Sequence, residues 1–206
     1  MIRPLTGIPA DKARSYASIE AIAAALRDKL GIEELERFDA LDFFEKQIGE
    51  MVIVDHDREV KMIEAIDDCP QEGMTRWDTE AEKLEIVLAQ RTYDLLQENH
   101  VRARSTVAHE TGHAILHTAQ IIRLAGMSLK SHVAFHRDRN SHKAYLDTEW
   151  QANAFASSLL MPAEGVRTLV EEKNFTTAKL AHVYGVSEES ALYRLESYWR
   201  SLGLEK

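Results

Sequence analysis

The chain has 206 residues, of which 45% are hydrophobic and 29% are charged, and its formal net charge is −9. A chain of this length can bury a hydrophobic core without a metal, so a bound metal ion would serve chemistry rather than stability. The acidic balance argues against a protein that binds nucleic acid or anionic membranes through its overall charge. The single cysteine, Cys69, excludes an internal disulfide and a cysteine-rich zinc site.

No segment has the run of about 20 apolar residues that a membrane-spanning helix needs. The first residues lack the uninterrupted apolar stretch of a secretory signal. We therefore expect a cytoplasmic protein that has no membrane partner.

The first half of the chain mixes helices with short strands. Residues 11–30 have apolar side chains at helical spacing and precede Gly31, and residues 39–48 form a shorter helix candidate before Gly49. The pattern then changes to β-rich runs. Strands are predicted at residues 51–54, 60–63, 74–77 and 84–88.

The second half is predicted to be mostly helical. Helices are expected at residues 92–98 and 104–117, and another should begin at Thr148, where Gln151 completes the pattern of a capping box, and end before Pro162. Residues 119–147 are less regular, with one strand candidate at 132–135, and residues 163–206 look all-helical with a turn at Gly185. Because helices and strands are segregated along the chain, we expect an α+β fold.

One helix candidate carries the motif H-E-x-x-H, in which His109 and His113 flank Glu110. Residues four apart on a helix lie about 6 Å apart on one face, so both imidazoles can bind one metal ion. Glu110 lies one residue round the helix, within reach of a water on that ion, which is where a general base is needed. The neighbours are apolar, and burying these three polar groups is costly unless a metal pairs with them. The motif therefore predicts a zinc site with Glu110 as catalytic base.

A catalytic zinc site needs a third protein ligand and one open position. Glu149 is the candidate, because it lies in the first turn of a helix whose other side chains are mostly small and apolar. The alternative is a surface carboxylate that the helix dipole favours. Asn153 lies one turn further on the same face, and we expect it to accept the N–H of a zinc-binding histidine and fix its tautomer. His117 continues the row of histidines, but three stacked histidines cannot all reach one ion on a straight helix, so we expect a hydrogen-bonding or packing role.

A peptidase also needs a group that faces the developing oxyanion. Five residues before Glu149 are candidates, and each could instead belong to a solvated basic loop: His132, His136, Arg137, His142 and Tyr145. The sequence does not choose among them.

Taken together, these motifs resemble the ImmA/IrrE-type metallopeptidase family. The resemblance rests on residues 109–117, 149–156 and 159–162, with further similarity at residues 102–104, Trp77 and 84–88. It implies a zincin-like fold of the gluzincin kind, in which His109, His113 and Glu149 bind Zn²⁺ and Glu110 activates zinc-bound water. It also implies an endopeptidase whose substrate is a regulatory protein, such as a transcriptional repressor. The segment 119–147 is long for the family, which leaves the substrate open.

We expect two parts in the chain. Residues 1–165 would form the zincin-like metallopeptidase domain, with a small twisted sheet and N-terminal helices. Residues 166–206 would form a helical segment, resembling a helix-turn-helix with its turn at Gly185, that packs on this domain. Lys179, Arg194 and Arg200 supply little positive charge. The residues that would face DNA include Glu188 and Glu189, so bracing the peptidase or docking a protein is favoured over binding DNA.

Two other functions remain open. One is a DNA-binding transcriptional regulator in which zinc is structural. The other is an interaction protein of the toxin–antitoxin type with a vestigial metal site. The intact base and ligand motifs favour a working peptidase.

Overall fold

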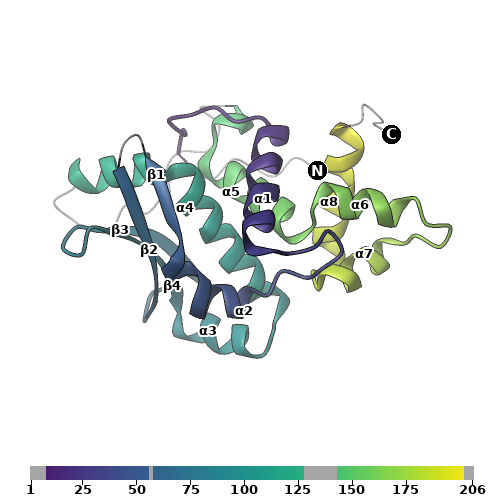
Figure 1. Cartoon of the computed structure of the whole chain (residues 1–206), viewed down its shortest axis with the longest axis horizontal. Helices are drawn as coiled ribbons and strands as arrows, with labels where there is room; N and C mark the ends of the chain where they lie inside the picture. Colours follow the sequence, from purple (N-terminus) through teal and green to yellow (C-terminus); the bar gives the residue numbers. More distant parts are fainter. Residues whose placement is uncertain (1–7, 56–57, 128–142, 202–206) are drawn as a thin grey trace. The chain divides into compact units, whose positions relative to one another are not determined.

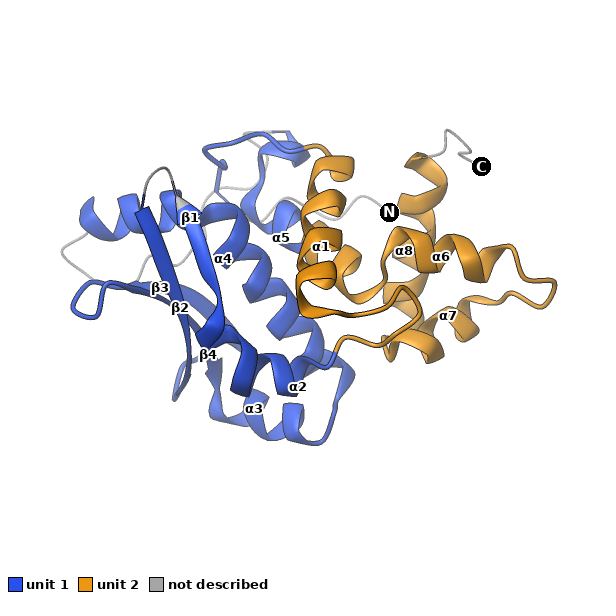
Figure 2. Cartoon of the chain, viewed as in Figure 1, with its two compact units in different colours: residues 1–14, 39–153 blue, residues 15–38, 154–206 orange. Residues whose placement is uncertain are grey.

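The computed structural model describes residues 8–55, 58–127 and 143–201, and it has an α+β fold with one four-stranded sheet (Figure 1). The chain divides into two compact units (Figure 2). Unit 1 contains residues up to 14 and 39–153, and unit 2 contains residues 15–38 and 154 onward. The predicted domain boundary at residue 165 stays a prediction. None of the described helices is long and apolar enough to cross a membrane.

The sheet lies in unit 1 and has the strand order β1-β2-β4-β3. Strand β1 (Val52–Asp55) pairs antiparallel with β2 (Arg58–Asp67), which runs parallel to β4 (Lys83–Ala89). The edge strand β3 (Gly73–Asp78) pairs antiparallel with β4. All four strands were predicted from the sequence. Strand β1 has the predicted length but is shifted by one residue, and the other three are longer than predicted by two to six residues.

The burial of the strands shows which side chains of the sheet face the core of unit 1. Strand β4 is buried from Leu84 to Ala89, as its apolar run predicts for a strand with neighbours on both sides. In β3 the burial alternates, so that Thr75 and Trp77 are buried and Arg76 between them is less so. This alternation places Thr75 on the face of the sheet that helix α4 (Val101–Met127) covers.

Helix α4 (Val101–Met127) runs along the sheet and packs against β3 and β4 (Figure 1). It continues ten residues beyond the predicted end at His117, so the expectation of irregular structure directly after residue 118 was wrong. Gln120 holds this extension, because its side chain bonds to Pro9 O at 2.9 Å and accepts from Asp11 N at 3.0 Å. The predicted strand at 132–135 lies outside the described residues.

The other helical segments of unit 1 are short. They are α2 (Ala40–Asp42), a π-helical turn (Phe43–Gln47), a 3-10 turn (Ile48–Glu50), α3 (Gln90–Gln97) and a 3-10 turn (Ala144–Leu146). The single helix predicted at 39–48 is thus a succession of three helical turns.

Helix α5 (Thr148–Leu160) begins where it was predicted to, but its cap differs. The carboxylate of Asp147 accepts from the main-chain N–H of Trp150 at 2.7 Å, which makes Asp147 the capping residue. The predicted capping box of Thr148 and Gln151 is therefore wrong. Gln151 turns its side chain toward two main-chain carbonyls of unit 1 instead, those of Lys12 and Tyr145.

Unit 2 contains α1 (Tyr16–Leu30), α6 (Ala163–Val170), α7 (Thr177–Tyr184) and α8 (Glu188–Ser201). Helix α1 begins five residues later than predicted, because the Ser15 side chain caps it. Gly31 ends α1 as predicted, and its φ of 68° is the left-handed conformation that glycine adopts easily.

Arg194 of α8 is a structural residue of unit 2. Its side chain is 1% exposed, donates to Met161 O at 2.7 Å and to the Tyr16 hydroxyl at 2.8 Å, and pairs with Glu20. A guanidinium buried in this way cannot contact DNA phosphates, so counting Arg194 toward a DNA-facing positive charge was wrong.

Candidate metal centre

Helix α4 presents its two motif histidines on one face. His109 and His113 are one turn apart, and their ring centroids are 4.7 Å apart. His113 and the intervening Glu110 are buried, because this part of α4 packs against β3 and β4. The apolar helix predicted from the sequence is thus a buried helix with polar groups at its centre.

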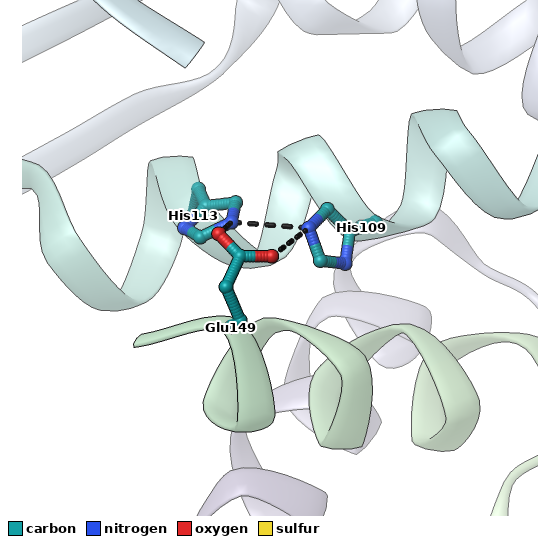
Figure 3. Close-up of side chains that lie close together, drawn as sticks. All are labelled: His109, His113 and Glu149. Atoms are coloured by element: carbon teal, nitrogen blue, oxygen red, sulfur yellow. Dashed lines mark hydrogen bonds and ion pairs between the residues drawn. The ribbon is translucent and has the colours of Figure 1, made fainter. Parts of the chain in front are cut away.

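Glu149 approaches the two histidines from the first turn of α5 (Figure 3). Its Oε2 lies 3.1 Å from His109 Nε2, and its Oε1 lies 3.1 Å from His113 Nε2. The two Nε2 atoms are also 3.1 Å apart. The structure therefore brings together the three residues proposed from the sequence as metal ligands.

These three residues fit a metal ion. Their ligand atoms all lie within 4.8 Å of one another. Ligand atoms at the vertices of a tetrahedron about 2.0–2.1 Å from a central zinc ion would be about 3.3 Å apart. The observed separations of 3.1 Å are close to this value. Two imidazoles and one carboxylate form a donor set that suits zinc.

The electrostatics of the centre favour a cation. Burial raises the pKa of Glu149, but the hydrogen bonds from His109 and His113 outweigh this and hold that pKa far below its usual range. Burial lowers the pKa of His109, but the hydrogen bond with Glu149 and the negative charge of Glu110 outweigh it and raise that pKa. Glu149 is therefore a carboxylate that needs positive charge beside it, and a metal ion would supply that charge in place of protons.

The proposed base, Glu110, is held by the edge strand of the sheet. The Thr75 hydroxyl lies 2.9 Å from Glu110 Oε2 and 2.9 Å from Glu110 O. Gly73 permits this close approach, since a Cβ at that position would lie 2.8 Å from Thr106 Cγ2 and 3.1 Å from Glu110 Cγ. Thr75 was not predicted from the sequence, in which its only signal was its place in a strand candidate.

His117 has the hydrogen-bonding role that was expected of it. It is buried, and its Nδ1 lies 3.2 Å from His113 Nδ1 while its Nε2 lies 3.1 Å from Gln151 Oε1. Burial and then the charge of His113 lower the pKa of His117 to about 3, so this imidazole is neutral at physiological pH. Gln151 was considered only as a helix cap, and its contact with His117 was missed.

Asn153 lies beside the ligands. Its side chain forms a hydrogen bond with His109 that favours the charged imidazole, and its amide nitrogen donates to Glu149 O at 2.7 Å. Whether Asn153 fixes the tautomer of a zinc-binding histidine stays a prediction.

Of the five candidates for the oxyanion-facing group, the structure describes Tyr145. It lies in the 3-10 turn before α5, its residue is 42% exposed, and Lys143 Nζ lies 5.7 Å from the centre of its ring. The other four, His132, His136, Arg137 and His142, lie outside the described residues. Tyr145 stays a candidate for this role.

Comparisons with known proteins locate one family. The model of the IrrE N-terminal-like domain, a peptidase family, matches residues 96–196, which include the H-E-x-x-H motif and Glu149. No curated protein matches the chain. A solved structure of a Mycobacterium tuberculosis transcriptional regulator is 18% identical, with a TM-score of 0.49, over 87% of this chain and 46% of that one. The chain thus spans less than half the length of that regulator, and a likeness at this level does not bear on function.

Proposed function

Because the chain belongs, through residues 96–196, to the ImmA/IrrE-type peptidase family, we propose that it is a zinc-dependent endopeptidase. Its substrate is a regulatory protein, such as a transcriptional repressor, in which it hydrolyses one peptide bond. The observation that supports this proposal most is that both carboxylate oxygens of Glu149 lie close to His109 and His113. Glu110 directly follows His109 in α4.

Each residue of the centre has a separate role in this proposal. His109, His113 and Glu149 would hold Zn²⁺, which when bound supplies a Lewis acid that polarises a carbonyl and makes water more acidic. The Glu110 carboxylate takes a proton from the water that attacks the peptide carbonyl carbon, and it passes this proton to the amine nitrogen as the C–N bond breaks. Thr75 keeps that carboxylate in one orientation by its hydrogen bond to Oε2.

Charge supports a regulatory protein that binds DNA as the substrate. The chain carries a formal net charge of −9. Opposite charge steers two proteins together, and DNA-binding repressors have basic surfaces. An acidic peptidase would therefore meet such a repressor faster than it would meet an acidic protein.

The DNA-binding alternative has little support in the described part of unit 2. The first turn of α8 exposes Glu188 and Glu189, which would repel phosphates. Lys179 of α7 forms an ion pair with Glu172. With Arg194 buried, the charge of these two helices does not favour DNA.

The experiment that tests the proposal compares proteins newly cleaved in cells that express the wild type or Glu110→Gln. Mass spectrometry of new protein N-termini should find cleavage sites in a regulatory protein with the wild type only. Equal sets of N-termini in both strains would overturn the proposal. If zinc binding were retained in that case, the alternative of an interaction protein with a vestigial site would be favoured.

A further inference from the structure

Gln151 has an amide whose orientation is fixed by the main chain. Its side chain is fully buried, and its Nε2 lies 2.9 Å from Lys12 O and 2.8 Å from Tyr145 O. Carbonyl oxygens only accept hydrogen bonds, so the amide NH₂ group must face them. A flipped amide would set Oε1 against two oxygens. Gln151 Oε1 therefore points to His117 Nε2, 3.1 Å away.

The orientation of Gln151 determines the tautomer of His117. Because the amide oxygen only accepts, His117 Nε2 must carry the proton of their hydrogen bond. A neutral imidazole has one N–H, which leaves a lone pair on His117 Nδ1. This lone pair faces His113 Nδ1 at 3.2 Å.

These contacts continue to the metal centre. A hydrogen bond between the two Nδ1 atoms requires a proton on His113 Nδ1, because His117 Nδ1 has none. Because Nδ1 keeps its proton, Nε2 is the nitrogen of His113 that a metal ion would bind. That atom lies 3.1 Å from both His109 Nε2 and a Glu149 oxygen. The nitrogen of His113 that is left for the metal therefore lies where the three proposed ligand atoms meet.

We propose that Gln151 and His117 form a positioning relay that keeps a proton on Nδ1 of His113 and so leaves its Nε2 as the nitrogen that binds the metal. The relay rests on the proposed function in one respect: the proposed function requires the three ligands to bind a metal ion. Neither residue touches the metal or the substrate in this role. Both position His113, whose ring could otherwise adopt either tautomer and either orientation when a metal binds.

The relay also connects the metal centre to the N-terminal segment of unit 1. Residues 8–14 lie beside the stretch before α5, since Ala10 N donates to Leu146 O at 2.6 Å and Arg14 N donates to Tyr145 O at 3.2 Å. These bonds place Lys12 O and Tyr145 O where Gln151 needs its two acceptors. The hydrogen bonds of this segment therefore help to set the tautomer of His113.

The first test needs neither zinc nor a substrate. In metal-free wild type, nitrogen NMR of the imidazoles should show a proton on Nε2 of His117 and on Nδ1 of His113. Gln151→Met removes the amide, and His117 should then exchange between tautomers. A wild type in which Nδ1 of His113 carries no proton, or in which His113 averages between both tautomers, would overturn the relay.

The second test measures zinc affinity in two matched variants of His117. Asparagine places Oδ1 near the position of the histidine Nδ1, so His117→Asn keeps an acceptor for His113, whereas His117→Phe keeps a ring without one. We expect His117→Phe to lose about 10–100-fold in zinc affinity, as is common when a residue that orients a ligand is removed, and His117→Asn to retain most of it.

Equal affinities of the two variants would overturn the relay while leaving the proposed peptidase intact. Conversely, the expected difference in affinity together with no cleavage of any protein would overturn the peptidase and leave the relay. Circular dichroism of both variants checks folding. If His117→Phe does not fold, the tautomers of the metal-free wild type decide the question alone.

Discussion

The hydroxyl of Thr75, on the edge strand β3, lies 2.9 Å from the Oε2 of Glu110 on helix α4. The sheet thereby holds the carboxylate that we propose as the catalytic base. We expect Thr75→Val, which removes the hydroxyl at nearly the same volume, to lower kcat by about 10–100-fold. This corresponds to the loss of one hydrogen bond to a charged group, about 1.5–3 kcal/mol.

Thr75→Ser keeps the hydroxyl and is the control for this prediction. Zinc content and KM should be close to those of the wild type in both variants, because Thr75 contacts none of the three proposed ligands. A Thr75→Val protein that cleaves its substrate as fast as Thr75→Ser would show that Glu110 needs no support from the strand.

A glycine in unit 2 tests the packing of the helical part of the chain. A Cβ on Gly165 of α6 would lie 1.9 Å from the Tyr184 hydroxyl and 2.3 Å from Glu34 O. Tyr184 itself donates to Glu34 O at 2.7 Å, so neither group can move without breaking a bond. We expect Gly165→Ala to lower the free energy of unfolding by about 1–3 kcal/mol, measured by urea denaturation.

Gly126 near the end of α4 is the matched control. A Cβ there meets no atom within 4 Å. Alanine is favoured over glycine in a helix by about 1 kcal/mol at most, so Gly126→Ala should be neutral or stabilising. Equal unfolding free energies for Gly126→Ala and Gly165→Ala would contradict the packing described for α6.

The single cysteine gives a prediction about reactivity. Burial raises the pKa of the Cys69 thiol, which also donates to Gln71 O at 3.2 Å. The thiolate is the reactive form, and a raised pKa means that less of it is present at pH 8 than in an unfolded chain. Alkylation by iodoacetamide at pH 8 should therefore be slow in the native protein and fast in urea. Equal rates in both conditions would contradict the burial of Cys69.

Much of the fold could be predicted from local patterns. Alternating and continuous apolar runs identified all four strands, and Gly31 and Pro162 marked the ends of helices. The end of α4 was missed because it depends on tertiary contacts. Gln120 lies more than 100 residues from Pro9 and Asp11, to which it bonds, and no pattern within the helix shows this.

The candidate centre divides in the same way. His109, Glu110 and His113 could be found because their spacing matches one turn of a helix, and Glu149 because a carboxylate stood out at the start of an apolar helix. Thr75 and Gln151 could not be found. Their hydrogen bonds to Glu110 and His117 span 35 and 34 residues, so they depend on how the sheet and α5 pack against α4.

We propose that His109, His113 and Glu149 together hold one zinc ion beside Glu110. The most direct measurement is the metal content, by mass spectrometry, of the wild type, Glu149→Ala and Glu110→Gln purified without chelator. We predict one zinc per chain in the wild type and in Glu110→Gln, and little in Glu149→Ala. Full zinc content without Glu149 would contradict the ligand set, and no zinc in the wild type, even after zinc is added back, would contradict the metal centre itself.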